Sequence, residues 1–465
     1  MNGGEQRLER TLTLRGAVTL NLLDMIGVGP FITLPLLIGA MGGPQAMVGW
    51  VLGALLAACD GMVWAELGAA MPEAGGTYVY LEQMYPGRVG RWLSFLFAFQ
   101  LLLSAPLSVA SGCIGVAAYA GAVVPGLRGH AVLVAVASVV VAVGLQYRRL
   151  SGVKRVAQGL LVIVLATIAW TVVTGAWHGE WSRVVAVPSG AFHLDAGFFV
   201  GLASAMLIAT YDYWGYYNVT FLGGEAKDPG RVIPRAVLWS IAIVAVLYLA
   251  LTTSVLSVMG AEGLIKAQRP DIRQAMLSEF MQMAYAPSVG VVAAGVIGKI
   301  AAVLVMVTAF GSVFSLLLGY SRIPYAAARD GNFPRVFGRL HPTRGFPYVS
   351  LLTLAGVASV CCFFSLKHVI EALVVVRIVM QFSLQHVGVM LLRKKRPGMK
   401  RPFRMWLYPL PPIVALVGFA YIVFVRRGSA VGLMIAGAVV LVGTVVFLVR
   451  GSGGRTRDRY PTHAR

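Results

Sequence analysis

The stretch DMIGVGPF, residues 24–31, carries an acid, two glycines and a proline inside an otherwise apolar run. Pro30 cannot donate a helical hydrogen bond and its ring clashes with the preceding turn, while Gly27 and Gly29 loosen the same place. The sequence therefore predicts a helix that breaks in the middle of this run. In hydrocarbon, backbone groups freed by such a break are tolerated only where they line a cavity or find partners in the protein.

The composition around this stretch is that of a membrane protein. Of the 465 residues, 58% are hydrophobic and only 12% are charged, and the mean hydropathy is +0.78. These values exclude an ordinary soluble domain. Apolar stretches of about 20 residues, long enough to cross about 30 Å of hydrocarbon, recur along the chain. We predict twelve membrane spans, at 16–41, 46–71, 92–122, 131–147, 156–177, 196–223, 236–259, 288–321, 347–366, 368–392, 404–425 and 429–450.

The net charge of +21 is concentrated in alternate loops. Basic clusters precede the first span and follow the second, fourth, sixth, eighth and tenth, where the sequence reads RKKRPGMKRPFR at 393–404. By the positive-inside rule, both termini are cytoplasmic and the chain is a multi-pass protein of the cytoplasmic (inner) membrane. We therefore attribute the positive charge to membrane topology and to contact with anionic lipid, and not to nucleic-acid binding.

A second break is predicted in the sixth span, at ATYDYWGYYNVTF, residues 209–221. Asp212, Gly215 and Asn218 interrupt the apolar helix there, and aromatic residues crowd the same stretch. Spans one and six are five apart and begin on opposite sides of the membrane, as expected of an inverted repeat of spans 1–5 and 6–10. Paired breaks offer N–H groups to an anion and carbonyl groups to a cation. The structural alternative is two kinked helices packed by small residues, with no ligand.

Four longer motifs have a familiar pattern: GVGPF (27–31), AELGAAMPEAGGTYVY (65–80), FLGGEAKDPGRVIPRAV (221–237) and SRIPYAAARDGNFPRVFGRLHPTRGFPYVS (321–350). Over about residues 15–450 the chain resembles the amino acid–polyamine–organocation (APC) superfamily of permeases, in its LAT-like and polyamine-uptake-like bacterial branches. The resemblance implies an all-α membrane protein with a LeuT-type 5+5 inverted repeat, twelve transmembrane helices, and helices 1 and 6 unwound at mid-membrane. The implied divisions are a cytoplasmic N-terminal segment 1–15, a first repeat 16–177, a second repeat 196–392, two further spans within 404–450, and a cytoplasmic tail 451–465.

The resemblance also implies where an α-amino acid would bind. Its carboxylate would meet backbone N–H groups around Val28, Gly29 and Phe31, and its amine would meet carbonyl groups at the two breaks. Tyr211 falls where the family places an aromatic gate. Val28 stands where many relatives have serine, which removes one hydroxyl from the implied carboxylate site. The implied substrate-binding residues are Ile26, Gly27, Val28, Gly29, Phe31, Tyr211, Asp212, Tyr213, Trp214, Gly215 and Tyr216.

Acidic side chains inside the predicted spans need an explanation, because a charge at bilayer depth costs about 2.5–3.5 kcal/mol or more unless it is paired, protonated or hydrated. Asp24 and Asp212 lie at the breaks, so we interpret them as sites for a cation, a proton or a substrate amine. For Asp60 we favour a buried ion pair with Arg377, with a coupling role as the alternative. We interpret His386 as a hydrogen-bonded packing residue. The candidate residues for ion coupling are Asp24, Asp212, Ser312, Ser315 and Asp60.

Together these features predict a secondary active transporter (permease) that imports or exchanges amino acids by alternating access, linked to protons or, through Ser312 and Ser315, to sodium. A polyamine or cationic amino acid transporter is the alternative, favoured by Asp24 and Asp212. A channel or a non-transporting receptor is a remote alternative. The sequence has no nucleotide-binding glycine loop, nucleophile elbow or zinc spacing, so we predict no enzyme, cofactor or metal. The expected partners are a small-molecule substrate and membrane lipid, and the expected assembly is a monomer or homodimer.

Overall fold

The computed structural model describes residues 10–147, 150–266, 275–364, 374–426 and 429–450. The predicted tail at 451–465 and the first nine residues of the N-terminal segment lie outside these ranges. Within them the regular structure is helical, apart from two isolated β-bridges. The longer helices are α1 (Leu14–Met25), α2 (Gly29–Met41), α3 (Met47–Ala70), α5 (Gly87–Val123), α6 (Ala131–Gln146), α7 (Leu150–His178), α8 (Ala196–Tyr213), α10 (Pro229–Lys266), α12 (Met276–Val289), α13 (Val291–Tyr320), α15 (Tyr348–Cys361), α17 (Leu384–Lys395), α18 (Leu410–Val425) and α19 (Ser429–Arg450).

The described helices are those of an integral membrane protein. Nine of them are long and apolar enough to cross a membrane, and the bent pair α1–α2 would make a tenth. Two more, α15 and α18, are apolar but shorter. The all-helical membrane architecture is thus confirmed, whereas the number of twelve spans and the 5+5 repeat stay predictions.

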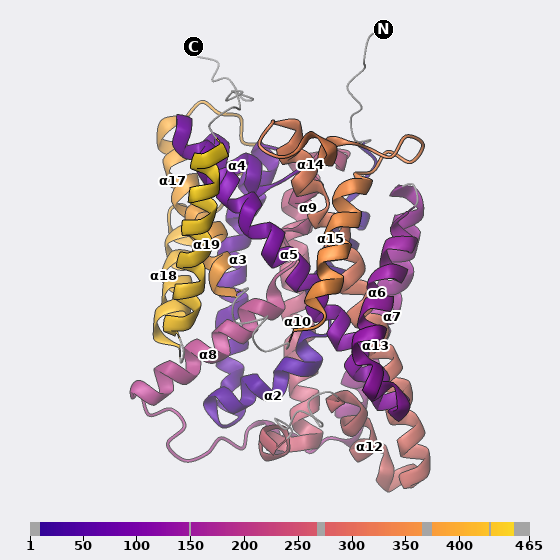
Figure 1. Cartoon of the computed structure of the whole chain (residues 1–465). Coiled ribbons are helices and arrows are strands. Elements are labelled where there is room, and N and C mark those ends of the chain that lie inside the picture. Colours follow the sequence, from indigo (N-terminus) through magenta and orange to yellow (C-terminus); the bar gives the residue numbers. More distant parts are fainter. Residues whose placement is uncertain (1–9, 148–149, 267–274, 365–373, 427–428, 451–465) are drawn as a thin grey trace.

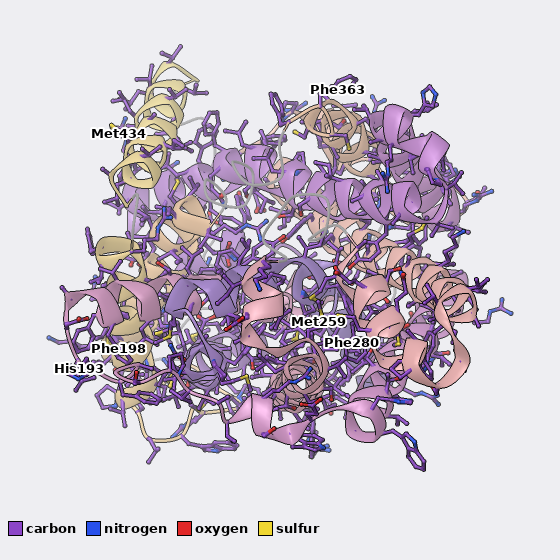
Figure 2. The ribbon with its side chains drawn as sticks, turned by 90° about the horizontal axis from the view of Figure 1, so that it is seen from below. His193, Phe198, Met259, Phe280, Phe363 and Met434 are labelled. Atoms are coloured by element: carbon purple, nitrogen blue, oxygen red, sulfur yellow. The ribbon has the colours of Figure 1, made fainter. Side chains whose placement is uncertain are left out.

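The perimeter of the bundle is apolar. Seen along the bundle from below, Phe363 and Met434 lie at the rim, whereas Met259 of α10 and Phe280 of α12 lie further in (Figure 2). Phe363 is 72% exposed and Met434 is 65% exposed, while Phe280 is fully buried. Large exposed apolar side chains on the outer faces of long helices are expected where the surrounding solvent is lipid.

The predicted spans omit three helices that the structure contains. They are α4 (Thr77–Met84), α12 and α14 (Arg322–Arg329), of 8, 14 and 8 residues. A window long enough to detect a membrane span passes over helices of this length. The second of them packs against α13 and buries Met276, Leu277 and Phe280. These short helices pack against the longer helices of the bundle.

The chain just before α1 is tied to the segment that leaves the second predicted break. The Leu12 N–H donates to Glu225 O over 2.8 Å, and the Lys227 N–H donates to Leu12 O over 3.0 Å. Arg322, the first residue of α14 (Arg322–Arg329), donates from Nε to Glu225 Oε1 over 2.8 Å, and both side chains are buried. The start of α1 is therefore fixed against the exit of the second break. Figure 1 places α14 and the start of the described chain at the same end of the molecule.

Candidate functional site

The predicted first break is present. Helix α1 ends at Met25 and α2 begins at Gly29, and the two axes are bent by 49°. The N–H groups of Val28 and Gly29 donate to no backbone carbonyl in the described part of the chain, whereas the Phe31 N–H donates to Val28 O over 3.1 Å. Of the three N–H donors that the resemblance implies, two are therefore free for a ligand at the positive end of α2.

The predicted second break is present as well. Helix α8 ends at Tyr213, and the chain turns through Gly215 before the short helix α9 (Asn218–Phe221). Gly215 has φ +123°, and a Cβ built on it would lie 2.7 Å from the Met25 nitrogen and 2.9 Å from the Asp24 carbonyl carbon. The two breaks therefore touch each other, which the sequence predicts only through the symmetry of the repeat.

Two side chains hold the breaks together. The Tyr248 hydroxyl lies 2.6 Å from Met25 O and 3.1 Å from Asp212 O, so it joins the last turns of α1 and α8. Asn21 donates from Nδ2 to Tyr216 O over 2.6 Å, and its Oδ1 accepts from the Val219 N–H over 3.0 Å. Carbonyl groups freed by the breaks thus have partners within the protein, as burial in a membrane requires.

A central cavity lies beside the two breaks, with an empty volume of about 520 Å³, open solvent included. It brings together nine of the candidate substrate-binding and coupling residues. These are Asp24, Gly27, Val28, Gly29, Tyr211, Asp212, Trp214, Gly215 and Ser312. Its remaining lining residues are Met25, Ser108, Ser111, Gly112, Tyr217, Leu316, Tyr320 and Arg377.

Other predicted residues lie outside this lining and contact the surrounding helices. The ring of Tyr213 packs edge-on against Trp50, with 5.6 Å between centroids, and Ile26 is fully buried. Phe31 O accepts from the Tyr119 hydroxyl over 3.2 Å. Tyr216 donates its hydroxyl to Asp60. A direct role of these residues in substrate binding stays a prediction.

The two candidate serines of α13 differ in how they are engaged. The Ser312 hydroxyl lies 3.3 Å from Asp24 O, at the edge of the cavity. The Ser315 hydroxyl donates to Leu20 O over 2.7 Å and accepts from Asn218 Nδ2 over 2.9 Å. Ser315 thus ties α13 to α1 and α9, and its hydroxyl hydrogen is already donated to a protein group.

The two acids at the breaks are buried and incompletely satisfied. Asp24 is 8% exposed and Asp212 is 3% exposed. Asp212 Oδ2 lies 2.5 Å from the Thr33 hydroxyl oxygen, which also lies 2.9 Å from Gly29 O. Within the described residues, Asp24 Oδ2 and Asp212 Oδ1 have no hydrogen-bond partner. Both carboxyl groups therefore keep an oxygen for a proton or a ligand.

Arg377 lines the cavity, whereas the sequence interpretation assigned it only to an ion pair with Asp60. It is 2% exposed and lies just before the π-helical turn η6 (Ile378–Ser383). Its Nη2 donates to Ser108 Oγ over 3.0 Å and its Nη1 donates to the Tyr217 hydroxyl over 3.3 Å. An arginine inside an apolar run is a functional signal in its own right, and π-helical turns are frequent at functional sites.

The expected ion pair between Asp60 and Arg377 is wrong. Asp60 Oδ2 accepts from Trp64 Nε1 over 3.0 Å and from the Tyr216 hydroxyl, and His386 Nε2 lies 3.1 Å from Asp60 Oδ1. His386 and Asp60 are both fully buried. Arg377 and His386 lie nine residues apart on one predicted span, so even in a regular α-helix, at about 100° per residue, they face opposite sides. Only one of the two can therefore reach Asp60.

We expect a double-mutant cycle to detect the Asp60–His386 contact. Asp60→Asn and His386→Gln should each lower the free energy of unfolding, measured by denaturation in detergent. The double variant should lose about 1 kcal/mol less than the sum of the two single losses, because the two groups share one contact. Asp60→Asn combined with Arg377→Gln serves as the matched control and should be additive. Coupling in the Arg377 cycle and none in the His386 cycle would contradict this arrangement.

The chain is similar to known proteins along almost its whole length. The amino acid permease family model matches residues 12–449. The chain is 25% identical over 433 residues to the serine/threonine exchanger SteT of Bacillus subtilis, covering 91% of this chain and 92% of the relative. The human Asc-type amino acid transporter 1 is 23% identical over 451 residues, covering 95% of this chain and 82% of the relative. The branched-chain amino acid permease BcaP of B. subtilis is 24% identical over 437 residues, covering 89% and 87%. These relatives are amino acid transporters and not enzymes.

Proposed function

Because this chain belongs to the amino acid permease family of the APC superfamily, we propose that it is a proton-linked secondary transporter of α-amino acids that works by alternating access. The observation that supports this proposal is the contact between two helix breaks at one cavity. Free N–H groups at the start of α2 suit the substrate carboxylate, and the ends of α1 and α8 suit the ammonium group. Tyr211 and Trp214 line the same space and would contact the side chain.

We propose that all twelve predicted spans cross the membrane, with α15 and α18 as its shorter members. A span of these lengths, 14 and 16 residues, requires local thinning of the bilayer or continuation of the helix. Spans 1–5 and 6–10 then form the inverted repeat, and the two breaks occupy equivalent positions in it. The basic segment of α14 lies at the same end as the first described residues (Figure 1), which supports a cytoplasmic location for that end.

The cavity favours a zwitterionic substrate over a polyamine. A polyamine would suit Asp24 and Asp212, but it would bring several positive charges next to the buried Arg377. The names of the relatives include serine, threonine and branched-chain amino acids, which are zwitterions at neutral pH. A neutral amino acid also satisfies the free N–H groups of Val28 and Gly29 with a single carboxylate.

Counterflow in proteoliposomes tests the proposal. Liposomes loaded with unlabelled L-serine, L-threonine or L-leucine should accumulate the same labelled amino acid, and the D-enantiomers and putrescine should support much less uptake. Empty liposomes and liposomes with protein inhibited by excess external substrate are the controls. A conductive leak without stereospecific exchange would identify a channel, and the absence of any exchange across all amino acids would reject amino acid transport.

A further inference from the structure

The central cavity contains a buried positive charge that no carboxylate neutralises at short range. Among the described residues, no carboxylate oxygen lies within 4 Å of Arg377, and its Nε has no hydrogen-bond partner. Its partners are the hydroxyl groups of Ser108 and Tyr217, and its guanidinium carbon lies 5.7 Å from the Trp214 ring centroid and 5.1 Å from that of Tyr320. The positive charge of Arg377 is therefore not cancelled by a single ion pair, and it acts on all the charged groups that line the cavity.

The charge of the cavity follows from the groups that line it. They come from α1 (Asp24), α8 (Tyr211 and Asp212), the second break (Tyr217), α13 (Tyr320) and the α-helical residues just before η6 (Arg377), while α5 supplies serines and a glycine. With both aspartates ionised and the tyrosines neutral, the formal charge is −1. Asp60 lies outside this lining and faces His386, Tyr216 and Trp64 instead. A closed site at bilayer depth is most stable when its total charge is zero.

We propose that Arg377 sets the number of positive charges that enter with each substrate, so that a zwitterionic amino acid is taken up with one proton, which binds Asp212. The inference rests on the proposed function, because it concerns the substrate cavity of an amino acid transporter. Two carboxylates and one guanidinium carry a net charge of −1, which one proton neutralises when the substrate is a zwitterion. Without the guanidinium, the two carboxylates would need two protons.

Geometry favours Asp212 over Asp24 as the proton site. The Thr33 hydroxyl has one hydrogen but faces two oxygens, Gly29 O at 2.9 Å and Asp212 Oδ2 at 2.5 Å. A hydroxyl in a helix commonly donates to the carbonyl four residues before it. If Thr33 donates to Gly29 O, a proton on Asp212 Oδ2 supplies the second bond by donating to the Thr33 oxygen. Asp24 then remains ionised and balances Arg377 across the cavity.

The charge count can be measured directly. Full-length protein in liposomes is given a tenfold outward L-serine gradient at equal pH on both sides, and potassium with valinomycin sets the voltage at which net serine flux stops. One charge per serine corresponds to about 59 mV and two charges to about 30 mV. We expect one charge for the wild type, one for Arg377→Lys and two for Arg377→Gln. The exposed Arg231→Gln is the matched control and should also give one.

Several results would overturn the inference. A count of one in Arg377→Gln, or of zero or two in the wild type, would show that Arg377 does not set the stoichiometry. Serine uptake that requires sodium and moves no proton into pyranine-loaded liposomes would reject the proton on Asp212. Absence of serine, threonine and leucine transport in the wild type would instead reject the proposed function, so the two failures are distinguishable.

A binding measurement also tests the inference if the protein catalyses only exchange, without net flux, or if a variant folds poorly. If one proton binds with the substrate, the serine Kd in detergent should rise toward about tenfold per pH unit on the alkaline side, because binding and protonation are linked. We expect the Kd to rise toward about tenfold per pH unit for the wild type and Arg377→Lys. For Arg377→Gln the rise should approach about a hundredfold per pH unit. A Kd independent of pH in the wild type would overturn the inference.

Discussion

Gly215→Ala is expected to reduce amino acid uptake at least about tenfold, because it places a methyl group between the two helix breaks. At φ +123° the new side chain costs on the order of 1–3 kcal/mol in backbone strain. Its Cβ would also lie 2.7 Å from the Met25 nitrogen and 2.9 Å from the Asp24 carbonyl carbon, and the backbone there cannot move as a side chain can. The two breaks would have to separate, which changes the cavity between them.

Uptake and unfolding temperature in detergent should be measured on the same preparations. Gly437→Ala is the matched control, because a Cβ at this position in α19 has no atom within 4 Å and should leave both quantities unchanged. If Gly215→Ala transports at the wild-type rate, the close contact between the breaks is not required for function. A loss of uptake in both glycine variants would point to a general effect of the substitution.

Asp212→Asn is expected to abolish proton-driven accumulation while keeping exchange. With one proton per substrate, a gradient of one pH unit drives about tenfold accumulation, since this gradient is worth about 1.4 kcal/mol. The amide cannot take up a proton, but its N–H can donate to the Thr33 oxygen as a protonated carboxyl group would. The ratio of substrate concentrations inside and outside the liposomes should therefore fall to its value without a pH gradient, and counterflow should remain.

Asp228→Asn provides the control, because Asp228 is 60% exposed and lies outside the cavity. Its accumulation ratio should match that of the wild type. Accumulation by Asp212→Asn that still follows the imposed pH gradient would move the proton site elsewhere in the cavity, with Asp24 as the first residue to test. Loss of counterflow as well as accumulation would assign Asp212 to substrate binding.

The break at residues 26–28 could be predicted because its cause is local. Proline lacks the N–H that a helix needs, glycine weakens the turn beside it, and both effects act over a few residues. The same holds for the helical character of the chain and for most of its long helices, since hydropathy over about 20 residues reflects the thickness of a bilayer. The helices that escaped prediction, α4, α12 and α14, are shorter than that window.

The partners of the buried charges could not be predicted, because they depend on how helices rotate against one another. Arg377 and His386 belong to one predicted span, and the sequence interpretation paired Asp60 with the former. His386 instead lies beside Asp60, and Arg377 lines the cavity. Which of the two faces Asp60 depends on how the span is rotated against its neighbours, and composition does not reveal that rotation.

The sequence by itself determined that this chain is a helical membrane protein with two interrupted helices, because chain stiffness and hydrophobicity are properties of neighbouring residues. Only the tertiary structure decided that the two interruptions touch at Gly215 and that one arginine and two aspartates share the cavity beside them. Contacts between residues far apart in the chain depend on helix rotation and packing, and a shift of one residue in register exchanges one side chain for another.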